Sequence, residues 1–110
     1  MMLFKPEHVP MILSGRKTQT RRLGKKRWNV GSTHQCQTKM LRNDSVFARV
    51  LIKDVRRERL REMRPCDIYA EGYDRYSEYC DALERINGVK VDGDTEVWVV
   101  EFEMIDEAAA

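Results

Sequence analysis

The chain has 110 residues, of which 42% are hydrophobic, and this size predicts one domain over residues 1–110 with a small core. No run approaches the roughly 18 apolar residues of a membrane span, and the N-terminus lacks the apolar segment of a secretory signal. We therefore expect no membrane partner and an intracellular, cytoplasmic location. The three cysteines form no Cys-x-x-Cys pair, so we expect no disulfide framework, no metal site and no cofactor.

The net charge of +2 is the sum of two very different halves. Residues 1–61 contain 16 Lys or Arg and 4 Asp or Glu, a net charge of +12, whereas residues 62–110 contain 4 and 14, a net charge of −10. A basic half suggests a face that binds a polyanion such as a nucleic acid. The alternative is that the two halves interleave in space and neutralise one another.

The N-terminal part of the chain predicts a strand, a helix and an extended basic segment. Residues 2–4 form an apolar edge strand, and residues 9–13 have the spacing of a short buried helix that a glycine ends. Residues 17–23 are then extended. Side chains alternate between two faces of an extended segment, so Lys17 and Thr20 point to opposite faces. A bend or bulge must bring these two side chains together if they act jointly.

Residues 24–29 form a loop that combines three cations with one aromatic ring, namely Lys25, Lys26, Arg27 and Trp28. In this setting Trp28 can stack on an unpaired base, as in proteins that hold single-stranded RNA. Alternatively, Trp28 folds back and caps the core while the three cations stay solvated.

The remainder of the chain predicts a mainly β fold. We expect strands over residues 34–40, 46–55 and 96–104, short helices over 67–73 and 76–86, turns at 42–45 and 92–94, and a frayed tail over 106–110. Residues 56–59 either continue the middle strand or turn out of it. On the last strand the predicted core face carries Trp98, Val100, Phe102 and Met104. Five or six mostly antiparallel strands with two or three small helices indicate an α+β fold, built as a small mixed barrel or a curled sheet.

Lys17 and Thr20 are the candidates for chemistry, since neither a Gly-rich phosphate loop nor a histidine-based triad is recognisable. A threonine hydroxyl becomes a nucleophile when a base takes its proton, and a lysine serves as that base when burial or nearby cations lower its pKa. Such cations are present in Arg16, Arg21 and Arg22. The alternative is that the lysine, the threonine and the arginines simply bind phosphate.

Glu71 is the candidate from the acidic half. It ends a short helix beside Gly72, where the missing side chain lets another group approach the backbone closely. A glutamate in the same cleft as Lys17 and Thr20 can pass a proton to a leaving amine. The alternative is an ordinary glutamate on a helix surface.

The motif Gly15-x-Lys17-x-x-Thr20-x-Arg22 resembles the signature of the ASCH domain, a family with the PUA-like β-barrel fold. Val30-Gly31, the run Ala70-Glu71-Gly72-Tyr73 and the last strand follow in the family's order. The resemblance spans nearly the whole chain. It implies a PUA-like mixed β-barrel with two or three short helices, and a cleft between the motif and the helical region.

The resemblance also implies a set of functions. PUA-like domains typically bind RNA, some small ASCH relatives are amidohydrolases that remove the acetyl group of N4-acetylcytidine, and others are reported to cut RNA. In the amidohydrolases a lysine and a threonine of the motif act with a glutamate of the helical region. The matching residues here are Lys17, Thr20 and Glu71, and no metal is required.

We therefore expect an RNA-associated domain that binds RNA or a modified nucleotide in the cleft. In this hypothesis the phosphates are held by Arg21, Arg22, Lys25, Lys26 and Arg27, and Trp28 stacks on a base. One alternative is a metal-independent amidohydrolase that deacetylates N4-acetylcytidine-type nucleosides through Lys17, Thr20 and Glu71. A ribonuclease that uses the same cleft is the other, and a monomer is expected in each case. The basic loop favours a polymer, because a free nucleoside carries no phosphate.

Overall fold

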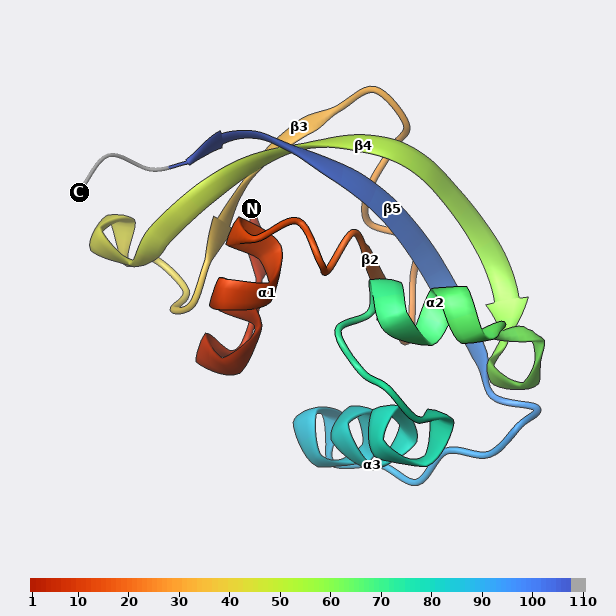
Figure 1. The fold of residues 1–110 in the computed structure, drawn as a ribbon. Coiled ribbons are helices and arrows are strands. Elements are labelled where there is room, and N and C mark those ends of the chain that lie inside the picture. The colour runs from red at the N-terminus through yellow and green to blue at the C-terminus, as the bar shows by residue number, and fades with distance from the viewer. Residues whose placement is uncertain (108–110) are drawn as a thin grey trace.

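The structure is a computed structural model that describes residues 1–107. Five strands form one curled mixed sheet in the order β1-β3-β4-β5-β2. Their bounds are Met2–Leu3 (β1), Gln19–Arg22 (β2), Thr33–Gln37 (β3), Val46–Arg59 (β4) and Glu96–Glu107 (β5). β1 runs parallel to β3, and the other three pairings are antiparallel. The long strands β4 and β5 arch over the rest of the molecule, as Figure 1 shows.

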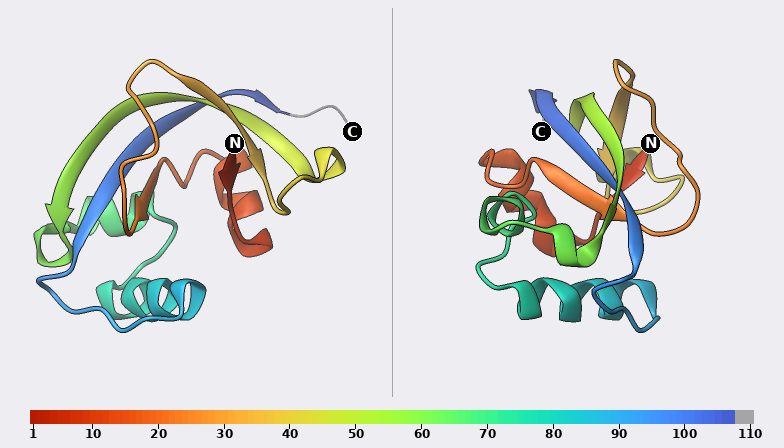
Figure 2. Two further views of the ribbon diagram at one scale, coloured as in Figure 1. Left: turned by 180° about the vertical axis from the view of Figure 1, so that it is seen from behind. Right: turned by 90° about the vertical axis from the view of Figure 1, so that its right-hand side faces the viewer.

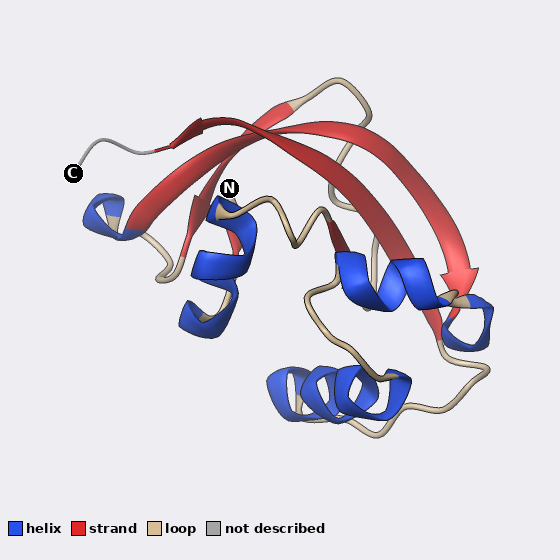
Figure 3. Cartoon of the chain, in the orientation of Figure 1, coloured by secondary structure: helices blue, strands red, loops and turns tan. Residues whose placement is uncertain are grey.

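The helices lie on the concave side of this arch (Figures 2 and 3). They are α1 (Val9–Leu13), α2 (Pro65–Ala70) and α3 (Tyr76–Asn87), with single 3-10 turns at Pro6–His8, Asn43–Ser45 and Leu60–Glu62. The predicted α+β class, mainly β, is confirmed as a curled half-barrel. None of the helices in residues 1–107 has the length and apolarity that crossing a bilayer requires.

The curl of the sheet comes from β4. Its pairing with β5 shifts register between Arg49 and Val50 and again between Ile52 and Asp54. Such bulges bend a strand and increase its twist. The strand continues to Arg59, which answers whether residues 56–59 extend it or turn out of it.

The twist also changes which face of β5 is buried, and here one prediction is wrong. The adjacent residues Val99 and Val100 are both fully buried, since the first half of β5 packs towards α3 and the second half packs under the arch. A strict alternation places Trp98 in the core, but its ring is only half-buried. Its Nε1 donates to the carbonyl oxygen of Gly24 at 3.1 Å, and the Arg57 guanidinium covers its face.

Other boundaries differ by a few residues. The strand predicted over 34–40 ends at Gln37, and the helix predicted over 67–73 is α2. Residues 106 and 107 are paired with β4 rather than frayed, and the rest of the predicted tail, 108–110, lies outside the described residues.

The two edge strands of the sheet are joined by a side chain. β1 and β2 form opposite edges, and Arg22 of β2 donates from Nη2 to the carbonyl oxygen of Leu3 in β1 at 2.8 Å. The guanidinium of Arg22 also lies over the rings of Phe4 and Trp28, 4.9 and 5.4 Å from their centroids. Arg22 therefore links β1 and β2 on the open side of the half-barrel, where the two strands are not paired with each other.

Candidate functional site

A cavity of about 80 Å³ lies between the basic segment and the helical region. It is bounded by the β1–α1 segment, by Lys17 and β2, by the end of α2 and by the inner face of α3. The residues that line it and enter the argument below are Lys17, Thr20, Arg21, Arg22, Glu71 and Tyr79. The three predicted catalytic residues therefore border one cavity.

Lys17 and Glu71 form a buried ion pair. Lys17 Nζ lies 2.8 Å from Glu71 Oε1, and each residue is only 2% exposed. The ammonium also donates to the carbonyl oxygens of Gln19 at 2.8 Å and Glu71 at 3.1 Å, so each of its three hydrogens has an acceptor. Burial lowers the pKa of Lys17, and the negative charge of Glu71 opposes that change. The neighbouring arginines, on which the sequence argument relied, lower the pKa of Lys17 less than burial does.

Lys17 precedes β2 and Thr20 lies within it, and the segment before the strand is held by hydrogen bonds to two helices. Residues 16–18 precede the strand, and the amide of Lys17 donates to Met11 in α1 while that of Thr18 donates to Ala70 in α2. Lys17 and Thr20 consequently border the same cavity. The described residues show no hydrogen bond between their side chains, because Thr20 Oγ1 accepts from Arg22 Nε at 3.1 Å and Lys17 faces Glu71.

Gly72 is what allows Glu71 to sit where it does. Gly72 has φ +99°, and a Cβ at this position would lie 2.4 Å from the sulfur of Met11. The group that approaches the backbone beside Glu71 is thus the Met11 side chain of α1. The close approach fixes the end of α2 against α1, and with it the direction of the Glu71 side chain.

We expect Gly72→Ala to lower the free energy of unfolding by about 3 kcal/mol, since it adds an overpacked contact to the strain of a positive φ. Gly88→Ala is the matched control. Gly88 also has a positive φ, +67°, but a Cβ there meets nothing within 4 Å, so a loss of only about 1 kcal/mol is expected. Urea denaturation of both variants measures the difference, and equal losses would contradict the role of the Met11 contact.

Arg21 is placed differently from its predicted role. Its guanidinium is 3% exposed and bonds to Glu71 Oε2 at 3.0 Å and to Glu58 Oε1 at 3.1 Å, while Asp67 lies 3.9 Å away. Burial alone would lower the pKa of Arg21, but the surrounding carboxylates outweigh it and the net shift is upward. A guanidinium already held by carboxylates does not fit the predicted phosphate contact.

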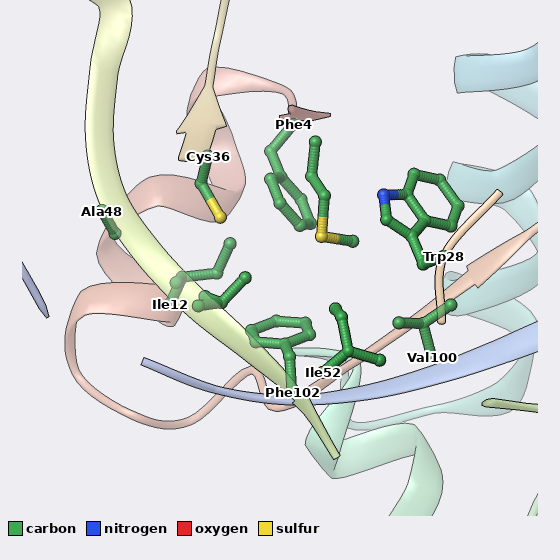
Figure 4. Packing of buried hydrophobic residues seen from close by; sticks show 10 residues of the cluster. Phe4, Ile12, Trp28, Cys36, Ala48, Ile52, Val100 and Phe102 are labelled. Carbon is green, nitrogen blue, oxygen red and sulfur yellow. The ribbon is translucent and has the colours of Figure 1, made fainter. Parts of the chain in front are cut away.

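Arg22 and Trp28 also depart from their predicted contacts. The guanidinium of Arg22 links the sheet edges and covers two aromatic rings, as described above. Trp28 is 7% exposed and packs among Phe4 and Val100 in the core (Figure 4). The second alternative for Trp28, a cap on the core, is the one the structure supports, and a stacking contact with a base is not available to this buried ring.

The three loop cations remain candidates for phosphate contact. Lys25, Lys26 and Arg27 are exposed, and none forms an ion pair within the described residues. Elsewhere the two charged halves interleave, the second of the two alternatives considered for the charge distribution. Cross-half pairs are Glu7–Arg85, Arg16–Asp74, Lys17–Glu71, Arg21–Asp67, Arg21–Glu71, Lys53–Glu103, Arg56–Glu101, Arg57–Glu96 and Arg61–Asp94. Ion pairs between the halves therefore neutralise much of the positive charge, and the loop holds three adjacent cations without such a partner in residues 1–107.

His8 and Tyr79 are among the lining residues of the cavity that were not predicted as site residues. His8 is buried with Nε2 2.9 Å from the Tyr73 hydroxyl, and Tyr79 reaches the cavity from α3. The helical spacing had marked Tyr79 only as an apolar position, and no sequence pattern marks His8. Among residues 1–107, no three His, Cys, Asp or Glu side chains gather in a way that could hold a metal ion.

Burial, followed by the positive charge of Lys17, lowers the pKa of His8 to about 4. The unfolded chain then binds a proton that the folded chain does not between pH 6.5 and about 4. We expect the free energy of unfolding to be intact above pH 6.5 and to fall by up to about 3 kcal/mol as the pH drops through this window. Urea denaturation at pH 7, 5.5 and 4 checks this. His8→Gln should remove most of the slope and His34→Gln should keep it, and similar slopes in the two variants would contradict the assignment.

Fold and cavity together define a small α+β domain whose curled mixed sheet encloses a charge-paired pocket. Three solved structures share this fold. A DUF984 protein from Enterococcus faecalis V583 matches with a TM-score of 0.71 and 16% identity over 92% of this chain and 68% of its own. An ASCH domain from Lactobacillus crispatus JV V101 gives 0.68 and 14%, over 91% and 70%. ASCH from Zymomonas mobilis also gives 0.68 and 14%, over 96% and 67%.

These likenesses show that the chain has the fold of ASCH-domain proteins, as the resemblance of the Gly15–Arg22 motif implied. At 14–16% identity they show the fold alone. No protein-family model and no curated protein matches the sequence.

Proposed function

We propose that this protein is an ASCH-type domain that binds a modified nucleoside and hydrolyses its N-acyl amide, as in N4-acetylcytidine. The observation that carries the proposal is the Lys17–Glu71 pair, 2.8 Å apart, buried, and bordering one small cavity with the Thr20 hydroxyl. Groups within hydrogen-bond reach that line a small pocket favour chemistry on a small ligand. The pairing of Arg16, Lys17 and Arg21 with carboxylates argues against an open basic groove for a polymer.

The size of the cavity supports the same conclusion. About 80 Å³ exceeds the 10–15 Å³ that one water needs and is about half of the cavity that binds benzene in an engineered core. The space accepts the acyl group and part of a base, while the sugar remains at the mouth.

In the proposed reaction, Thr20 Oγ attacks the carbonyl carbon of the amide and its proton passes to the neutral amine of Lys17. The C–N bond then breaks, and the departing amine takes a proton delivered through Glu71. Water hydrolyses the resulting ester on Thr20, which releases the acid and restores the hydroxyl. The sequence of steps requires Lys17 Nζ to exchange its contact with the Gln19 carbonyl for one with Thr20 when the ligand binds, and its lowered pKa favours the neutral amine.

The experiment that tests this proposal is incubation with N4-acetylcytidine, with release of cytidine followed by chromatography. Thr20→Val removes the hydroxyl and keeps the shape of the side chain. We expect cytidine from the wild type and none above background from Thr20→Val. A wild type that releases no cytidine, or a Thr20→Val variant that is equally active, would reject the proposal.

A second candidate function is binding of single-stranded RNA, and the exposed loop cations favour it. The triple variant Lys25→Gln/Lys26→Gln/Arg27→Gln should weaken filter binding and reduce the slope of log K against log salt by about 2, because three phosphate contacts are lost. A matched control removes three other exposed cations, Lys39, Arg49 and Arg59, in the same way. Binding that falls equally in both variants would show non-specific attraction only, and Glu71-dependent cleavage of the RNA would identify a ribonuclease instead.

A further inference from the structure

Tyr79 lines the cavity, and its buried hydroxyl has no hydrogen-bond partner within residues 1–107. It lies on the inner face of α3, its side chain is only 4% exposed, and its ring packs against that of Tyr73 with centroids 5.7 Å apart. Buried polar groups are normally paired, and an exception in a cavity indicates a contact with a ligand.

The basic side of the cavity holds a second unpaired donor. Both Nη groups of Arg21 bond to neighbouring side chains, but its buried Nε has no acceptor in the described part of the chain. A phenol hydroxyl and a guanidinium N–H both donate. The group that completes these residues is therefore an acceptor, such as an oxygen atom with free lone pairs.

The charges around the cavity indicate that this acceptor is neutral. The two buried cations of the lining, Lys17 and Arg21, are already paired with the carboxylates of Glu58, Asp67 and Glu71. Arg22 is half-buried and donates to the Thr20 hydroxyl and the Leu3 carbonyl oxygen. The only other lining cation, Lys5, is exposed. A carboxylate or phosphate placed inside would add an unbalanced buried charge, whereas a carbonyl oxygen would not.

We propose that the Tyr79 hydroxyl is a ligand-binding group that donates a hydrogen bond to a neutral ring carbonyl and selects ligands that carry one. This inference deepens the proposed function, because it names the part of the ligand that is recognised away from the bond that breaks. A pyrimidine with a carbonyl next to a ring nitrogen has the required acceptor. A ligand without that oxygen leaves the Tyr79 hydroxyl unpaired, and sites of this kind discriminate strongly.

The test compares two small probes. Cytosine carries the ring carbonyl, and 4-aminopyrimidine lacks that oxygen. Calorimetric titration of the wild type should show at least about tenfold tighter binding of cytosine, the value of one hydrogen bond of ordinary strength. In Tyr79→Phe, which removes only the hydroxyl, this preference should disappear. A wild type that binds neither probe or both equally, or a Tyr79→Phe variant that keeps the preference, overturns the inference.

Melting curves without ligand provide the second readout. Tyr79→Phe should melt at or above the wild-type temperature, since it removes a hydroxyl that no protein group satisfies. Tyr73→Phe is the matched comparison and should melt lower, because its hydroxyl lies 2.9 Å from His8 Nε2. If Tyr79→Phe loses as much stability as Tyr73→Phe, the Tyr79 hydroxyl has a structural partner and the inference fails.

The outcomes separate this inference from the proposed function. A Tyr79-dependent preference for cytosine without any release of cytidine from N4-acetylcytidine rejects the hydrolase and keeps the carbonyl subsite. If the wild type releases cytidine but Tyr79→Phe binds cytosine as well as the wild type does, the hydrolase is kept and the carbonyl subsite is rejected. A Tyr79-dependent response to inorganic phosphate, with none to cytosine, overturns the assignment of a neutral carbonyl.

Discussion

Lys17→Met should reduce kcat for N4-acetylcytidine hydrolysis by about 10³-fold or more, because it removes the base that takes the Thr20 proton in the proposed reaction. The loss in stability should be moderate. Glu71 loses its lysine but keeps Arg21 at 3.0 Å, so its buried carboxylate is not left without a cation. Circular dichroism and a melting curve verify that the variant is folded before its kinetics are measured.

Lys17→Arg separates the charge of Lys17 from its role as a base. An arginine keeps the positive charge beside Glu71 but does not release a proton at accessible pH. We expect this variant to be as inactive as Lys17→Met. In the wild type, activity should rise with pH through the pKa of Lys17, which burial holds below its ordinary value of 10.5.

Lys53→Met is the control for these kinetics. Lys53 also pairs with a carboxylate, Glu103 at 3.3 Å, but both groups are more than half exposed and lie away from the cavity lining. Its loss should change neither kcat nor the melting temperature appreciably. An active Lys17→Arg variant, or a Lys17→Met variant that keeps more than a tenth of wild-type activity, would exclude Lys17 as the base.

The sequence was sufficient for the elements whose pattern is local. The amphipathic spacing in residues 76–86 predicts α3 to within one residue, and the apolar alternation in residues 46–55 predicts the residue at which β4 begins. These predictions depend on periodicity alone. The failure at Trp98 has the same origin, since a strict period of two does not survive the twist that buries both Val99 and Val100.

The site was less accessible from the sequence, because its members come from distant segments. Only the resemblance to the ASCH motif selects Glu71 over other glutamates near helix ends. The carboxylates around Arg21 could not be foreseen, since Glu58 belongs to β4 and Asp67 to α2. Arg21, Arg22 and Trp28 were assigned to an anionic ligand by their chemistry, although carboxylates, a backbone carbonyl and the core already engage them. Residue type alone does not distinguish a cation that binds a ligand from one that neutralises the protein.

Replacement of Arg21 should have a large effect on the stability of the protein. Arg21→Met should lower the free energy of unfolding at pH 7 by about 3 kcal/mol or more, because it removes the cation shared by Glu58, Asp67 and Glu71 and leaves their charges buried together. Other cations, such as Lys17 beside Glu71, still contact single carboxylates and moderate the loss. None of them takes the place of Arg21 between all three carboxylates. Urea denaturation measures it.

Acid titration provides the second part of this prediction. The pKa of Asp67 is lowered to about 2: burial opposes this change, but hydrogen bonds from Arg64 and Gln19 and the charge of Arg21 outweigh burial. Stability from such a depressed carboxylate is present above its unfolded pKa of 3.8 and is lost as the pH falls towards 2. The difference in the free energy of unfolding between the wild type and Arg21→Met should therefore narrow below about pH 4. Protonated carboxyl groups carry no charge, so the loss of the Arg21 cation destabilises the protein less.

Arg85→Met is the matched control for Arg21→Met. Arg85 also pairs with a carboxylate, Glu7 at 2.8 Å, but the two side chains are 58% and 44% exposed. Exposed pairs contribute at most about 1 kcal/mol, so Arg85→Met should change the free energy of unfolding by less than that at any pH. If Arg21→Met loses no more than Arg85→Met, the buried carboxylates are not held by Arg21, and its guanidinium is available for the phosphate contact predicted from the sequence. The stability measurement thus decides whether Arg21 stabilises the fold or is available to bind a ligand.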